Sequence, residues 1–116
     1  VILKTIKCFN EKDYQMAIEI EALKEVAEVQ KEKYRNDHIQ RLKNGKCNVE
    51  SGIAFLEILT ICEKIIDHCS NVSIFTTNYM TNESYITKHE FFNKIYQTES
   101  KLLKDKLNEY SHKYAI

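Results

Sequence analysis

The stretch that decides the fold spans residues 53–66 and reads IAFLEILTICEKII. Ten of these fourteen residues are apolar, and neither proline nor glycine interrupts them. On a helical projection, Glu57, Lys64 and His68 lie opposite a broad apolar arc. The arc is centred on Ile58, Cys62, Ile65, Cys69 and Val72 and is widened by Phe55, Leu59 and Ile66. So broad an arc predicts a helix that packs against two neighbours at once.

The composition of the whole chain also favours an all-helical fold. Its 116 residues fit one domain, and they include no proline and only two glycines, Gly45 and Gly52. Sandwiches, Rossmann units and P-loops need several glycines at fixed places. Seventeen basic and seventeen acidic residues alternate without a basic stripe, which argues against nucleic-acid binding. The sequence shows no signal-peptide pattern and no apolar run long enough to span a bilayer.

Turn and capping residues divide the chain into three predicted helices, which span residues 11–44, 49–80 and 84–114. Gly45 suits the left-handed conformation that closes a helix. Asn48 can cap the next helix, and Glu50 lies in its first turn, where the helix dipole favours a negative charge. Short turns between long helices predict an antiparallel three-helix bundle over residues 10–116. We expect residues 1–9 to be the tail of a preceding helix or a linker.

The first and third predicted helices carry stripes of their own. The apolar stripe of the first contains Met16, Ile20, Leu23, Ala27, Gln30 and Tyr34, and another face carries Glu21, Glu25, Glu28 and Glu32. The stripe of the third contains Tyr85, Phe92, Tyr96, Leu103, Leu107, Tyr110 and Tyr114. We interpret this aromatic stripe as a packing face rather than a ligand box. The four cysteines, which include no C-x-x-C pair, are interpreted as small core residues in a reducing compartment.

A row of oxygen-bearing side chains lies along the predicted central helix. Glu63, Asp67 and Asn71 are spaced by four, so they follow one side of the helix at the border of the apolar arc. Oxygen donors at this spacing can share a cation if a neighbouring helix brings further carboxylates, and Glu28 is a candidate on the first helix. Acidic residues at a helix border are also common as ordinary solvated side chains. The spacing alone leaves both interpretations open.

Other chemical motifs are weaker. Glu109 and His112 form an E-x-x-H pair, which ferritin-like di-metal bundles use twice, together with two further carboxylates. Only one such pair is present, at the end of the chain. No serine or cysteine has a recognisable nucleophile context, so the sequence predicts no enzyme.

Two motifs resemble a known family. Residues 38–47 read HIQRLKNGKC, which is similar to the H-I-x-R-L-x-x-G-x-C of PhoU-like domains. Residues 63–72 read EKIIDHCSNV and are similar to the E-R-(I/V)-x-D-H-C-S-N-I of the same family. The closing KYAI resembles the family ending K-Y-x-L. More particularly, the chain resembles the PhoU-like domains at the cytoplasmic C-terminus of bacterial sodium/phosphate cotransporters.

This resemblance implies a non-catalytic regulator of phosphate uptake on the cytoplasmic side of the cell membrane, built as one three-helix half of a tandem. It implies contact with the membrane portion of the same transporter or with a second PhoU-like bundle, and a homodimer is an alternative. Several PhoU-like proteins carry iron or zinc clusters bridged by carboxylates. Carried over to this chain, the implied metal ligands are Glu63 and Asp67, with Glu28 and Asn71 behind them.

The resemblance is incomplete at the implied cluster. Lys24 stands where the first-helix motif has an acid, and Lys64 stands where the second has arginine. An ammonium group among carboxylates supplies their countercharge and competes with a cation. Two alternatives to a metal-bearing regulator therefore stay open. One is a helical scaffold or dimerisation module without metal, and the other is a ferritin-like metal-binding bundle.

Overall fold

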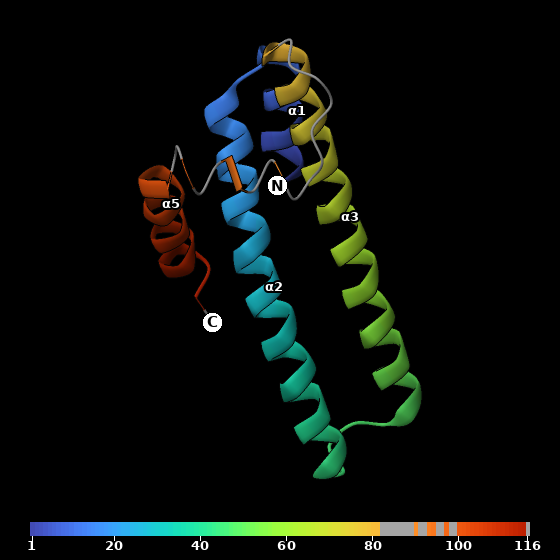
Figure 1. The fold of residues 1–116 in the computed structure, drawn as a ribbon. Coiled ribbons are helices and arrows are strands. Elements are labelled where there is room, and N and C mark those ends of the chain that lie inside the picture. Colours follow the sequence, from blue (N-terminus) through green and yellow to red (C-terminus); the bar gives the residue numbers. More distant parts are fainter. Residues whose placement is uncertain (82–89, 91–92, 95–96, 98–99, 116) are drawn as a thin grey trace.

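The computed structural model describes residues 1–81, 90, 93–94, 97 and 100–115. It confirms an all-α fold, because the described residues form helices joined by turns and no strand. The elements are α1 (Ile2–Glu11), α2 (Tyr14–Lys43), α3 (Val49–Thr81) and α5 (Ser100–Lys113). They form an elongated bundle of 55 × 24 × 23 Å (Figure 1). None of the described helices is long and apolar enough to cross a membrane.

The long helices α2 and α3 lie side by side as a hairpin, and their ends match the predicted bounds within a few residues (Figure 1). At the turn, Gly45 adopts a φ of 67°. The amides of Gly45 and Lys46 donate to the carbonyls of Leu42 and Arg41 at 3.2 and 2.9 Å, which closes α2 in a Schellman motif. Asn48 caps α3, since its Oδ1 accepts from the Ser51 amide at 2.8 Å.

The beginning of the chain differs from the prediction. Residue 11 ends α1 instead of starting the next helix, because Lys12 turns the chain with a φ of 52°. The side chain of Asp13 then caps α2 by accepting from the amides of Gln15 and Met16. Helix α1 packs on both α2 and α3, and its Cys8 is fully buried. Most of the segment expected to be the tail of a preceding helix or a linker therefore belongs to helix α1, which contributes to the core.

Helix α2 is the centre of the bundle. Residues 16–23 are buried around the whole circumference of the helix, because α1, α3 and α5 all pack against α2. Ile18 and Ile20 are fully enclosed, and Leu103 and Tyr110 of α5 reach the same core. We call this region the sheathed half of the hairpin (residues 14–26 and 66–77). The part of the hairpin that leads to the turn is called the open half (residues 27–43 and 49–65).

The buried face of α3 differs from the predicted one. Ile58 and Ile65, at the centre of the predicted arc, are 59% and 42% exposed. Helix α3 instead turns a face toward the core that contains Phe55, Leu59, Ile66, Cys69, Ser70, Ser73 and Thr77. The buried hydroxyl groups do not oppose this packing, because Ser73 and Thr77 donate to carbonyls one turn back in α3. Small hydroxyl-bearing residues therefore occupy an interface that hydrophobicity alone assigns to isoleucines.

Several predictions concern particular side chains. Cys8 and Cys69 are buried as expected, whereas Cys62 is exposed and Cys47 is half-buried. Leu103 and Tyr110 of the aromatic stripe are buried, which agrees with a packing face. The predicted third helix is described as α5 over its last part, and its residues Tyr85, Phe92 and Tyr96 lie outside the described residues.

Candidate functional site

The acid row, by which we mean Glu63 and Asp67 of α3, faces lysines of α2. The ammonium group of Lys31 lies 3.0 Å from a carboxylate oxygen of Glu28 and 3.1 Å from one of Glu63. The side chain of Lys31 is only 15% exposed, so it lies between the two helices rather than in open solvent. Hydrogen bonds to Glu28 and Glu63 raise the pKa of Lys31, which keeps it charged. The structure thus brings Glu28 and Glu63 together around an internal cation.

Lys24 occupies the next turn of the same contact. Its ammonium group lies 3.3 Å from Asp67, and its side chain is 13% exposed. This is the countercharge that the sequence predicted for a lysine at this position. Asn71 follows one turn further along α3 and is exposed. Three of the four predicted ligands therefore already face a lysine ammonium group.

A small groove runs beside these ion pairs. It has a volume of about 180 Å³, and its lining includes Ala27, Tyr34, Leu59, Cys62 and Ile66 together with the charged residues Lys24, Lys31, Glu28 and Glu63. Pockets for small organic ligands are typically larger, roughly 300–1,000 Å³. The groove is therefore smaller than a typical pocket for a small organic ligand.

The fit to an iron or zinc cluster is poor. Such a cluster needs several anionic or imidazole donors around one point. Within the described residues, no three Asp, Glu, His or Cys side chains form such a group. The lysines also stand at the positions where a cation would balance Glu63 and Asp67. As the side chains are arranged, the protein neutralises its own acid row.

The E-x-x-H pair lies on the outer surface of α5. Both Glu109 and His112 are exposed, and Glu109 accepts from Lys106 at 3.1 Å. Ferritin-like sites need such pairs to project into the bundle core. The placement of this pair gives no support to a ferritin-like site.

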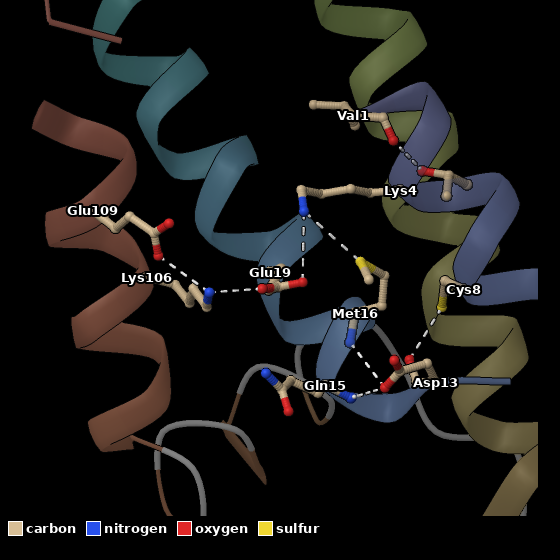
Figure 2. A network of polar contacts seen from close by, with 10 residues as sticks. Val1, Lys4, Cys8, Asp13, Gln15, Met16, Glu19, Lys106 and Glu109 are labelled. Atoms are coloured by element: carbon tan, nitrogen blue, oxygen red, sulfur yellow. Dashed lines mark hydrogen bonds and ion pairs between the residues drawn. The ribbon is translucent and has the colours of Figure 1, made fainter. Parts of the chain in front are cut away.

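A second ionic cluster joins three helices and was not predicted. Glu19 of α2 is 6% exposed and receives Lys4 of α1 at 3.7 Å and Lys106 of α5 at 2.8 Å (Figure 2). Lys106 also contacts Glu109 of its own helix at 3.1 Å. These hydrogen bonds raise the pKa of Lys106. Glu19 therefore ties α5 and α1 to the central helix.

A buried hydrogen bond connects α2 with α3. Glu21, expected on an acidic face of α2, is fully buried and accepts a hydrogen bond of 2.5 Å from the Ser70 hydroxyl. The expectation for Glu21 is wrong because α1, α3 and α5 together enclose this part of α2 on every side. The small polar residues of α3 opposite it were the available signal.

The first family-like motif lies at the open end of the hairpin. His38 is 1% exposed, its ring lies 5.1 Å from that of Phe55, and its Nδ1 lies 4.0 Å from the Cys47 sulfur. A Cβ at Gly52 would lie 2.9 Å from His38 Nε2, so glycine is what lets α3 approach the imidazole. These residues hold the two long helices together beside the turn.

Comparison of the chain with protein-family models, with curated proteins and with solved structures gave no match. The resemblance to PhoU-like domains therefore depends on the motifs at residues 38–47 and 63–72. In the structure both motifs lie along the α2–α3 contact, where they supply His38, Glu63, Asp67 and Ser70.

Proposed function

We propose that this chain is a non-catalytic helical interaction domain of the PhoU-like type, which regulates a sodium-dependent phosphate transporter from the cytoplasmic side of the membrane. It would do so by docking on the membrane portion or on a second bundle. A partner that binds one conformation of the transporter better than another shifts the populations of the two.

The observation that carries this proposal is the apolar face of α3, which we define as Ile58, Ile61 and Ile65. These side chains are 59%, 56% and 42% exposed, and they follow one another along the same side of the helix. Contiguous apolar surface of this kind marks interaction sites in soluble domains. The adjacent groove between α2 and α3 continues the apolar surface. A domain that docks on a partner would bury this apolar surface, whereas a bundle without a partner would leave it exposed to water.

The decisive experiment places charges on the apolar face. In the intact transporter that we propose carries this domain, Ile58→Glu together with Ile61→Glu should change phosphate uptake or its response to phosphate supply. Ser51→Glu together with His68→Glu is the matched control, because it adds two negative charges to the same helix at exposed polar positions. Equal uptake in the double variant and the control would argue that the face has no regulatory role.

The ion pairs of Lys24 and Lys31 favour a form of this function without metal. A helical scaffold or dimerisation module without metal is the second candidate, and the same ion pairs support it. Elemental analysis of protein purified without chelator separates these alternatives from an iron or zinc regulator. We expect less than stoichiometric iron and zinc. A full complement of either metal, lost in a Glu63→Ala, Asp67→Ala double variant, would restore the cluster implied by the family.

A further inference from the structure

The exposed side of α3 carries the residue spacing of a coiled coil. Ala54, Ile58, Ile61 and Ile65 follow one another at intervals of four, three and four residues, and all four are exposed. We call these four residues the seam. In a coiled coil, a seam of this spacing packs against the seam of another helix. The described residues of this chain supply no helix that covers it.

Two opposite charges border the seam. Glu57 and Lys64 are exposed, lie seven residues apart and line the same surface groove as Ile61. Neither forms an ion pair with a residue that the structure describes, in contrast to Glu63 and Asp67 on the side of α3 that faces α2. Charges directly beside a coiled-coil seam set the choice of partner and the orientation of the two helices.

The seam and its charges are self-complementary in one arrangement. A second copy of α3 can run antiparallel to the first about a two-fold axis between residues 59 and 60. Ile58 then faces the partner's Ile61, and Ile65 faces the partner's Ala54. Glu57 lies beside the partner's Lys64, and the symmetry repeats each contact. Opposite charges therefore meet at both ends of the isoleucine contact.

Other arrangements of the two helices lack this match. Shifting one antiparallel copy by seven residues brings Lys64 against the partner's Lys64 in one direction and Glu57 against the partner's Glu57 in the other. Like charges at such positions repel each other. In a parallel pair, the neighbours of Glu57 and Lys64 are the partner's Cys62 and Cys69, which offer no opposite charge. The charges thus favour the antiparallel pair centred between residues 59 and 60.

The apolar surface beside the seam continues onto α1. Ile2 and Leu3 are 55% and 82% exposed, and they line a groove together with Ile65. Protein interfaces commonly have an apolar centre and a polar rim. The isoleucines of α3 with these two residues supply such a centre, and Glu57 and Lys64 supply part of a rim.

We propose that the seam forms the interface of an antiparallel homodimer, in which Glu57 and Lys64 fix the register. The proposal rests on the docking role proposed above and specifies the second bundle as another copy of this chain. A standard interface contains about 20–30 residues a side, and the seam is much smaller. We therefore expect a weak dimer, with a dissociation constant of about 10–500 µM, and a monomer in dilute samples.

The test exchanges the two charges and measures self-association of the 116-residue chain by sedimentation equilibrium. Glu57→Lys and Lys64→Glu, made in separate proteins, each replace two ion pairs by two like-charge contacts. Each variant should raise the dissociation constant of its dimer about tenfold or more. An equal mixture of the two variants restores opposite charges at both contacts, and it should dimerise within about threefold of the unaltered chain.

Asp105→Lys is the matched control, because it makes the same change of charge at an exposed position of α5 and should leave the dissociation constant unchanged. An unaltered chain that stays monomeric at about 1 mM would overturn the proposal. A mixture of the two charge variants that is no more dimeric than its components would overturn it too, because the assigned register requires them to complement each other.

Cross-linking tests the register without altering the charges. Ile58→Cys and Ile61→Cys are made in separate proteins that also carry Cys47→Ser and Cys62→Ser, and the two proteins are mixed in a glutathione redox buffer. We expect more of the mixed disulfide than random pairing gives. An excess of the two symmetrical disulfides would indicate a parallel pair and would overturn the proposal.

Failure of the dimer and failure of the proposed function give different results. A monomeric chain, in a transporter whose uptake changes with Ile58→Glu together with Ile61→Glu, would overturn the dimer and leave docking on the membrane portion. A dimer that follows the charge exchange, in a transporter whose uptake does not respond to that double variant, would support the dimer and argue against regulation through it.

Discussion

The two halves of the α2–α3 hairpin differ in what surrounds them. In the sheathed half, residues 16–23 of α2 are buried on every side by α1, α3 and α5. In the open half, His38 is the only buried side chain of α2 between residues 27 and 43. The same pair of helices is therefore a packed core at one end and an exposed surface at the other. We infer that stability comes mainly from the sheathed half and that interactions with other molecules involve the open half.

The largest expected change in unfolding free energy comes from comparing one isoleucine in each half. Ile20→Ala in the sheathed half removes a fully buried side chain and should lower the free energy of unfolding by about 2–5 kcal/mol. Ile61→Ala in the open half makes the same chemical change at a side chain that is 56% exposed, and it should change the free energy by less than about 0.5 kcal/mol. Urea unfolding followed by helical circular dichroism measures both. Similar losses at the two sites would show that the open half is covered in solution.

A second, smaller effect concerns the ionic cluster that holds α5. Glu19→Gln leaves Lys106 and Lys4 without their shared carboxylate, and we expect a loss of about 1–3 kcal/mol, below the full cost of breaking a buried pair because the lysines are partly exposed. Glu109→Gln removes an exposed partner of the same Lys106 and should cost less than about 1 kcal/mol. Thermal unfolding of the two variants gives the comparison. Equal effects would mean that Glu19 is not the anchor.

The pH dependence of this cluster has a defined sign. Hydrogen bonds with Glu19 and Glu109 raise the pKa of Lys106 in the folded chain. Its contribution is therefore complete below the unfolded pKa of about 10.4 and is lost as pH rises through the higher folded value. The difference in unfolding free energy between the unaltered chain and Lys106→Met should narrow above about pH 10.4. A difference that grows with pH would contradict the assigned pairing.

The sequence predicted the hairpin because its signals are local. The turn depends on Gly45 and the capping residue Asn48, which act on amides and carbonyls within a few residues. The buried face of α3 could not be predicted in the same way. It depends on Glu21 meeting Ser70, a contact across 49 positions of sequence between two polar residues that hydrophobic patterns assign to the surface.

The candidate site was predicted only in part, because some of its features depend on one helix and others depend on how two helices meet. The spacing of Glu63 and Asp67 places them along one helix, and the position of Lys24 indicated a countercharge. The double contact of Lys31 with Glu28 and Glu63 was missed, because it depends on the rotation of α2 relative to α3. The periodicity of a sequence shows which residues share one face of a helix. It does not show how two packed helices are rotated relative to each other.

The two glycines sharpen the comparison within the open half. Gly52→Ala would place a Cβ 2.9 Å from His38 Nε2 and 3.0 Å from Cε1, so α3 or the imidazole must move, and we expect a loss of about 1–3 kcal/mol. Gly45→Ala meets no neighbour within 4 Å, but its φ of 67° strains an alanine, at a cost of about 1 kcal/mol. Unfolding midpoints measure both. Of the two variants, only Gly52→Ala should also disturb the packing of His38 against Phe55.

The smallest expected change in stability comes from a variant that tests whether Glu28 and Glu63 can bind a metal ion. Lys31→Met keeps the length of the side chain and removes its charge, so Glu28 and Glu63 lose their shared partner at the surface of the hairpin. Because both carboxylates are partly exposed, stability should fall by only about 0.3–1 kcal/mol, and the loss should shrink at high salt. The same variant should bind Zn²⁺ more tightly than the unaltered chain in calorimetric titrations, since two carboxylates would then lack a countercharge. Lys33→Met is the control, because Lys33 pairs with the exposed Asp37 away from α3. Unchanged Zn²⁺ binding in Lys31→Met would mean that these carboxylates do not converge on a cation site even without the lysine.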